Sequence, residues 1–465
     1  MTAFDNAMAR RNTAAQPALV QGTRKRAGGR AGLLGSSALS GGTLRGLVLV
    51  TGLAAAAPML APSHAAAQEI CGVSATGAEA QTGAGAVATG AAATACGALA
   101  NATGTNATAV GNSSLANGTF ATAVGQSANA TGLEATAFGD ASVANGDFAT
   151  ATGVNANANG SQATATGNFS HANGTFATAT GVSALANGTL ATATGQGSVA
   201  NGGNATATGQ ASIANGLFAT ATGQASFANG LSATATGHLS VANGIFATAT
   251  GDSSFANGFE ATATGQLAIA NGANAVATGS LALANGANAT ATGTAAFANG
   301  ANATAEGATS FANGANATAI GQLSLANGTN ATALGKGSIA NGATATALGQ
   351  GSLANATAAT AVGQGATVAV GATGGTAVGQ GATVAAGATN AAAFGAGAVA
   401  TVPNQMVFGT TTNTYQMPGL ASAASLASQV GPTNFVTSDG AGHLALSAFG
   451  PQTIAALQDD VKRGF

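Results

Sequence analysis

Small apolar residues alternate with polar ones along the middle of the chain, and glycine interrupts this alternation every seven residues. One series of glycines recurs every 14 residues from Gly97 to Gly363 without a gap. A second series includes Gly118 and fails at Ala356. The repeating unit has the consensus A-T-A-T-G-x-x-S-x-A-N-G-x-x, as in Ala191–Asn204. Two glycines per unit predict two turns and two short strands, and a fixed period over this length is typical of a solenoid.

The alternation assigns a face to each residue of the unit, because successive side chains of a strand point to opposite sides. In A-T-A-T-G the two Ala share one face, and in S-x-A-N-G the Ser shares a face with the Ala. We therefore expect a narrow tube with an interior of small side chains. The Asn-Gly pairs are expected at turns that need positive φ, and stacked Asn side chains are expected to hydrogen-bond along the tube.

The x residue of S-x-A-N-G then forms an outward-facing row at 14-residue spacing. Between residues 115 and 353 this row is apolar except at Asn129, Asn157 and His171. An exposed apolar stripe of that length indicates an interface between several identical tubes. The predicted interface row comprises Leu115, Val143, Leu185, Val199, Ile213, Phe227, Val241, Phe255, Ile269, Leu283, Phe297, Phe311, Leu325, Ile339 and Leu353.

The period lengthens to 16 residues after Gly363, with glycines at Gly379 and Gly395. Two additional residues per unit are expected to lengthen a loop without breaking the stack. The repeats are expected to end near Val402-Pro403.

Charge separates the start of the chain from the rest. Seven of the ten basic residues lie among the first 45, followed by an apolar run over Gly46–Leu60 and by Ala65–Ala67. This order predicts a secretory signal peptide that is removed before Gln68, with a membrane anchor as the alternative. The remaining chain has three basic residues against eleven acidic ones, which argues against nucleic-acid binding.

Candidate chemistry is sparse. In an exported protein, Cys71 and Cys96 are expected to form one disulfide. His171, His238 and His443 have no catalytic or metal-ligating partners at a characteristic spacing, and the carboxylates follow no regular pattern. We predict that the chain is not an enzyme and holds no metal or cofactor.

Several units resemble the head repeats of trimeric autotransporter adhesins of the YadA-like class: A-T-A-V-G (Ala121–Gly125), A-T-A-F-G (Ala135–Gly139) and A-T-A-L-G (Ala331–Gly335). The resemblance covers roughly residues 72–409. It implies an all-β fold, a left-handed parallel β-roll of about 14 residues per coil, assembled as a homotrimer. Asn404–Tyr415 is similar to the segment that terminates such heads, and the long basic leader is similar to the extended signal peptides of the family.

The C-terminal end departs from that family, whose members continue through a coiled-coil stalk to a β-barrel anchor. Ile454, Leu457 and Val461 are spaced like the start of a heptad seam, but no series of amphipathic strands follows them before Phe465. We therefore expect no membrane anchor in this chain. The predicted segments are an extended signal peptide (1–67), an N-terminal cap (68–96), 14-residue repeats (97–363), 16-residue repeats (364–402), a head-terminating segment (403–451) and the start of a coiled coil (452–465).

The sequence thus predicts the head of an exported adhesin, at the cell surface, in the outer membrane or in the extracellular space. It would attach to extracellular matrix, a host surface or an abiotic surface. Two alternatives remain open. Thr-x-Thr pairs recur from Thr150/Thr152 to Thr262/Thr264, and stacked threonine ranks are typical of proteins that bind ice or crystals. A passive surface spacer is the other alternative.

Overall fold

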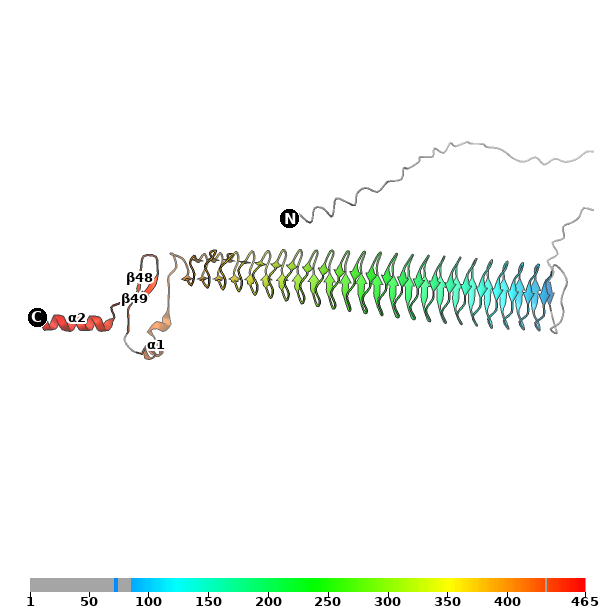
Figure 1. Ribbon diagram of the computed structural model, residues 1–465, viewed down its shortest axis with the longest axis horizontal. Helices are drawn as coiled ribbons and strands as arrows, with labels where there is room; N and C mark the ends of the chain where they lie inside the picture. Colours follow the sequence, from blue (N-terminus) through cyan, green and yellow to red (C-terminus); the bar gives the residue numbers. More distant parts are fainter. Residues whose placement is uncertain (1–70, 74–84, 431–432, 465) are drawn as a thin grey trace, which may run out of the picture. The chain divides into compact units, whose positions relative to one another are not determined.

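The computed structural model describes residues 71–73, 85–430 and 433–464. The predicted signal peptide and its cleavage site lie outside these residues, as does much of the predicted cap. Most of the described chain is a β-solenoid, which Figure 1 shows as a regular stack of narrow coils coloured from blue to yellow-brown. Five short elements follow it toward the C-terminus.

Each coil contains one strand of three residues and one strand of two. In one unit these are β17 (Thr192–Thr194) and β18 (Val199–Ala200). β17 pairs in parallel with β19 (Thr206–Thr208), and β18 with β20 (Ile213–Ala214), so each residue lies beside its equivalent 14 positions later. The expected parallel solenoid of 14-residue coils is confirmed.

The strands of successive coils stack into two sheets. Sheet A comprises the three-residue strands, from β3 (Thr94–Cys96) to β47 (Met406–Phe408). Sheet B comprises the two-residue strands, from β2 (Val87–Ala88) to β46 (Val399–Ala400). One further strand, β1 (Cys71–Val73), joins sheet A by pairing antiparallel with β3.

The interior of the solenoid contains small side chains. Alanines such as Ala193 and Ala200 are fully buried, and the serines of S-x-A-N-G, such as Ser198, are buried beside them. The Ser198 hydroxyl donates a hydrogen bond to the backbone oxygen of Gly195 at 2.9 Å, so its polar group is satisfied within its own turn. The predicted interior of Ala and Ser is therefore confirmed.

The Asn-Gly pairs do not occupy the positive-φ positions that the sequence predicted. Positive φ occurs at the glycine of A-T-A-T-G, such as Gly195 at +126°, and at the second residue after each Asn-Gly, such as Leu190 at +59°. The glycine after asparagine is required for space. A Cβ built at Gly202 would overlap the backbone carbonyl of Gly216 in the next coil. The pair marks a close approach of two coils.

The two additional residues of each 16-residue coil lie between its two strands, as expected. β42 (Thr367–Val368) is followed by β43 (Thr376–Val378) after a longer loop than in earlier coils, and pairing with neighbouring coils continues. Val368 and Val384 are buried in these coils at positions where the 14-residue coils have Ala. The longer loop therefore accompanies larger interior side chains.

The elements after the solenoid bury almost nothing. They are η1 (Pro418–Ala421), α1 (Ala423–Ala427), β48 (Val436–Ser438), β49 (Leu444–Leu446) and α2 (Pro451–Gly464). Ser422 caps α1 by accepting a hydrogen bond from the Ser425 amide. Among the described residues from 410 to 464, Gly450 is the only one that is buried. Neither α-helix in the described part of the chain is long and apolar enough to cross a membrane.

Candidate binding surfaces

The predicted interface residues lie in one row on the outer side of sheet B. Each is the first residue of a two-residue strand, and parallel pairing aligns it with its equivalent in the next coil, as in Leu185, Val199 and Ile213. Phe297 and Phe311 stack their rings with centroids 4.8 Å apart. All fifteen residues are half-buried by their neighbours within the chain. We call this set, with the polar residues that interrupt it, the outer row.

A second apolar surface lies at the turn after the Asn-Gly pair of each coil, or after the pair that takes its place, such as Thr131-Gly132. We call this surface the Asn-Gly edge and define it as the two residues that follow the pair. Six bulky side chains at the second position of this edge are about half exposed: Phe120, Phe148, Phe176, Leu190, Phe218 and Phe246. Leu133, Leu217, Leu231, Ile245 and Phe259 are exposed at the first position. This surface was not predicted, because only the x residue of S-x-A-N-G was followed along the sequence. Reading the two residues after Asn-Gly at the same spacing reveals it.

The backbone makes these edge residues unusual. Phe120, Phe148 and Phe218 have φ values of +59° to +60°, in the left-handed region that bulky side chains rarely adopt. The left-handed conformation costs about 1–2 kcal/mol per L-residue. In later coils the same position is asparagine, for example Asn288 and Asn302, which tolerates this conformation. Neither burial nor backbone preference explains the phenylalanines.

Asparagine side chains connect the coils in two ladders. The Asn of A-N-G donates from Nδ2 to Oδ1 of its equivalent in the next coil, in an unbroken series from Asn145 to Asn355. A shorter ladder on the Asn-Gly edge runs from Asn274 to Asn330. The predicted hydrogen bonding of stacked Asn is confirmed.

The threonine pairs form two aligned ranks on sheet A. Thr150 and Thr152 pair with Thr164 and Thr166, and the same register continues along the following strands to β27 (Thr262–Thr264). The first threonine of each pair is half-buried, and the second is half-buried or exposed. The arrangement is regular and in register, as the alternative of ice or crystal binding requires.

The two cysteines come together at the first coil. Cys71 lies directly opposite Cys96 where β1 pairs with β3. Opposite residues of antiparallel strands have Cα atoms about 4.5–5.5 Å apart, within the range that a disulfide spans. The side chain of Cys71 lies outside the described residues, so the bond between the two remains a proposal.

Two exposed histidine–aspartate pairs are the principal charged contacts. His238 Nδ1 lies 3.2 Å from Asp252 Oδ1, and hydrogen bonds from Ser253 and then from His238 lower the pKa of Asp252. In the loop between β48 and β49, His443 Nδ1 lies 2.8 Å from Asp439 Oδ2, and hydrogen bonds from the side chain and backbone of His443 lower the pKa of Asp439. His171 Nδ1 instead contacts the backbone oxygen of Phe169 at 2.7 Å.

These contacts do not assemble a reaction centre. In the part of the chain that the structure describes, no three His, Cys, Asp or Glu residues gather where they could hold a metal ion. The Ser253 hydroxyl donates to Asp252, away from the imidazole that a nucleophilic serine would need. The surfaces that distinguish this chain are therefore the outer row and the Asn-Gly edge.

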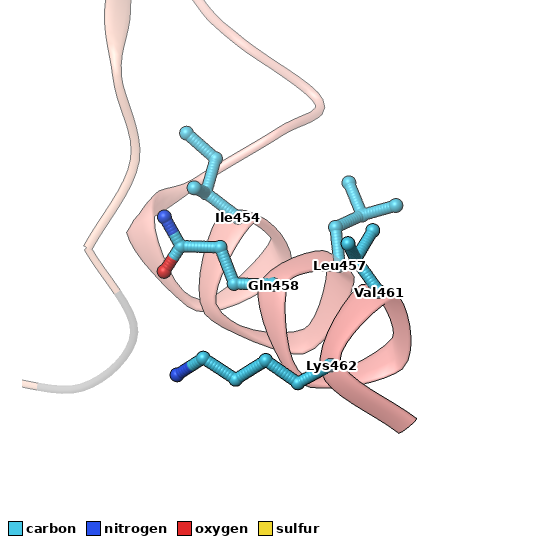
Figure 2. A pocket seen from close by; sticks show the side chains of 5 residues that line it. All are labelled: Ile454, Leu457, Gln458, Val461 and Lys462. Carbon is cyan, nitrogen blue, oxygen red and sulfur yellow. The ribbon is translucent and has the colours of Figure 1, made fainter. Parts of the chain in front are cut away.

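The C-terminal helix α2 presents an apolar side without a partner. Figure 2 shows Ile454, Leu457 and Val461 lining a shallow, open depression together with Gln458 and Lys462. The three apolar side chains are 43%, 56% and 59% exposed. A helix of 14 residues is marginal in water by itself, and most helical stability in proteins comes from packing of an apolar face. The helix therefore has a surface that suits association with other helices.

Comparison with curated proteins and with solved structures gives a weak likeness to an adhesin domain. No curated protein matches the chain. Among solved structures, the collagen-binding domain of the Yersinia adhesin YadA is similar over 60% of this chain and 86% of that chain, with 16% sequence identity and a TM-score of 0.15. A likeness of that strength supports no conclusion about the fold or a ligand.

The family comparison is specific to the coils. The sequence model of the YadA head domain repeat, which describes two copies of the repeat, matches residues 102–128, 130–156, 158–184, 179–205, 228–254, 235–261, 256–282, 312–338 and 340–366. These segments lie between residues 102 and 366 and leave residues 206–227 and 283–311 unmatched. The solenoid of this chain therefore contains YadA head domain repeats.

Proposed function

We propose that this chain is the head of an exported, trimeric, non-enzymatic adhesin. The observation that carries the proposal is the match of its coils to the YadA head domain repeat. The regular solenoid supports an adhesive role because it presents the same surface many times, whereas the charged contacts on it are isolated and exposed. Location at the cell surface, in the outer membrane or in the extracellular space follows from the basic leader predicted for residues 1–67.

The outer row supports assembly into a homotrimer. From Leu115 to Leu353 it spans eighteen consecutive strands of sheet B. With strands about 4.8 Å apart and a rise of about 3.3 Å per residue along each two-residue strand, the row covers about 600 Å² per chain. That area is comparable to what each partner buries in a stable protein interface. Three copies packed through this row, in left-handed coils as the family resemblance implies, would cover it completely.

The C-terminal elements independently support a trimer. Leu426, Val436, Leu444 and Phe449 are all more than half exposed in the single chain, as are most apolar residues of this segment. A segment that buries no side chain within one chain gains its stability from contacts with other chains. We propose that three α2 helices pack through Ile454, Leu457 and Val461 as a parallel coiled coil.

We place the adhesive contacts on the Asn-Gly edge. Exposed phenylalanines held at positive φ favour a role in binding, because strained residues persist where function requires them. They cluster between Phe120 and Phe246, while the later coils have the asparagine ladder at the same edge. We propose that this half of the solenoid contacts a polymeric target such as extracellular matrix or another host or abiotic surface. Collagen, which the similar Yersinia domain binds, is one such polymer.

Binding through repeated weak contacts predicts that avidity dominates. Several linked contacts can raise overall affinity by about 10²–10⁴-fold without any strong single site. The test measures binding of the full exported chain to immobilised collagen and to other matrix polymers, compared with the same ligand as a short soluble peptide. We expect strong retention on the immobilised polymer and weak binding of the peptide. Equal affinity for both forms would contradict a distributed surface.

Substitutions at the edge locate the contact. Phe148→Asn, Phe176→Asn and Phe218→Asn place at each position the residue that later coils use there. We expect each change to weaken adhesion several-fold and the triple change to weaken it further, while the coils become no less stable. The matched control is Asn288→Ser on the same edge, outside the apolar cluster, which should leave adhesion unchanged. If one of these substitutions abolished adhesion and left the assembly intact, a discrete site would replace the distributed one.

The threonine ranks keep ice or crystal binding as a second candidate. Their in-register arrangement over consecutive strands of sheet A is the observation that favours it. An ice-recrystallisation assay on the same protein separates the candidates. Inhibition that is lost in Thr206→Leu and Thr220→Leu, with unchanged binding to polymers, would assign sheet A to crystal binding. Inactivity in both assays would favour a passive spacer.

A further inference from the structure

Two asparagines interrupt the outer row at alternate coils near its N-terminal end, and a third lies at the same position one coil before Leu115. Asn101, Asn129 and Asn157 lie in strands β4 (Asn101–Ala102), β8 (Asn129–Ala130) and β12 (Asn157–Ala158). The Oδ1 atom of each is buried and has no hydrogen-bond partner within the chain. A buried acceptor without a partner costs about 1–3 kcal/mol, so three in one row require an explanation.

The cause of the missing partners lies in the residues of the adjacent coils. In the ladder from Asn145 to Asn355, every asparagine has another asparagine in the next coil and pairs with it. In the outer row, Asn129 lies between Leu115 and Val143, which offer no polar atom. The backbone N–H groups of Leu115, Asn129 and Val143 already donate to Ala128, Ser142 and Ala156, so none of them donates to Asn129 Oδ1. Asn157 lies beside Val143 and His171, and no hydrogen bond joins its Oδ1 to the imidazole. The partner for these amide oxygens therefore comes from solvent or from another chain.

We propose that Asn101, Asn129 and Asn157 form polar layers between chains, in which each side-chain amide pairs with the same residue of a second and third copy. The inference rests on the trimer proposed above and deepens it by naming the residues that meet. The terminal torsion of asparagine is soft, so each amide can turn its oxygen toward the neighbouring chain. The occupant of the outer row is therefore another copy of this chain in the same axial position.

Such layers explain how identical coils find one alignment. From Leu185 to Leu353 the row is uniformly apolar, so chains displaced by one coil would make nearly the same contacts. A displacement of one coil would place Asn129 against Leu115 or Val143 and leave its amide unpaired. A displacement of two coils would still pair Asn101 with Asn129 and Asn129 with Asn157, but it would place Asn157 against Leu185, so Asn157 distinguishes this alignment from the correct one. Isolated polar residues in an apolar seam specify register in coiled coils by the same principle, at some cost in stability.

The test places a charge in one layer. Asn129→Asp would bring three carboxylates together at the interface, where like charges raise the pKa of an aspartate. We expect the full exported chain with this change to be trimeric at pH 4. We expect its trimer dissociation constant to rise at least tenfold at pH 8, because the carboxylates ionise and repel one another. Sedimentation equilibrium over a concentration series measures both values.

The control carries the same chemical change away from the row. Asn145 belongs to the exposed asparagine ladder and lies two residues after Val143. The trimer dissociation constant of Asn145→Asp should be the same at both pH values, within twofold. Leu115 and Val143 flank residue 129 in the row, and the nearest titratable member is His171, three coils away. Glu134 and Asp140 lie at the nearby turns and are present in both variants. A difference between the variants therefore reports on the layer.

Each outcome bears on one of the two proposals. If the unaltered chain is not a trimer, the proposed assembly fails before the layers are tested. If the unaltered chain is a trimer and Asn129→Asp behaves like Asn145→Asp, the layers are wrong and the trimer stands. If Asn129→Asp does not fold, Asn129→Leu replaces it. An apolar layer should lower the trimer dissociation constant severalfold, and an unchanged constant would overturn the inference.

Discussion

Asn229 donates a hydrogen bond from Nδ2 to Oδ1 of Asn243 at 2.8 Å, although 14 residues separate them in the sequence. Asn243 donates in the same way to Asn257 at 2.9 Å. Each asparagine of the ladder thus joins two neighbouring coils outside the backbone hydrogen bonds. Because the interior contains small side chains that bury little apolar area, we infer that these amide bonds are a substantial part of what holds successive coils in register.

Removing one rung tests this inference. Asn243→Ala deletes two hydrogen bonds at an exposed position, so we expect a loss of about 1 kcal/mol in local stability. Backbone amides in the flanking coils should exchange with solvent about fivefold faster. The control is Gln266→Ala, an exposed turn residue that belongs to no ladder. Equal exchange rates in the two variants would show that the ladder contributes nothing.

Two glycines of one unit allow the stability cost of steric crowding to be measured separately from the cost of a left-handed backbone conformation. Gly202 lies where a Cβ would overlap the Gly216 carbonyl, whereas Gly197 has a φ of +64° with no atom near a Cβ. We expect Gly197→Ala to cost about 1 kcal/mol through the left-handed conformation alone. Gly202→Ala should cost more, about 3 kcal/mol, because the adjacent coil cannot move away. Urea denaturation measures both changes, and the reverse ranking would be inconsistent with the close approach.

The repeat pattern predicted most of the fold, because each residue of the unit repeats one structural position. Alternation identified the interior and the outer row, and the spacing of glycines identified the 16-residue coils. The role of Gly202 was not predictable from residue type, since glycine serves equally for positive φ and for close approach. The exposed Phe148 was missed because its turn position carries residues of many types. The unpaired amide of Asn129 depends on its neighbours Leu115 and Val143, which become adjacent only in the stacked coils.

The proposed disulfide gives a prediction for the first coils. If Cys71 and Cys96 are bonded, thiol titration of the unreduced, denatured chain should detect no free sulfhydryl, and reduction should release two. Reduction should also speed amide exchange near β3, where β1 covers the end of sheet A, and leave β17 unchanged. Two reactive thiols before reduction would refute the bond.

The mass of the assembly in solution tests the central claim that other copies of this chain cover the outer row. The chain has a mass of 42.9 kDa before any processing. Sedimentation equilibrium of the full exported chain at micromolar concentration should give three times the mass of one processed chain, with no dependence on concentration in that range. A stable, well-folded monomer under the same conditions would contradict the trimer, the coiled coil of α2 and the polar layers together.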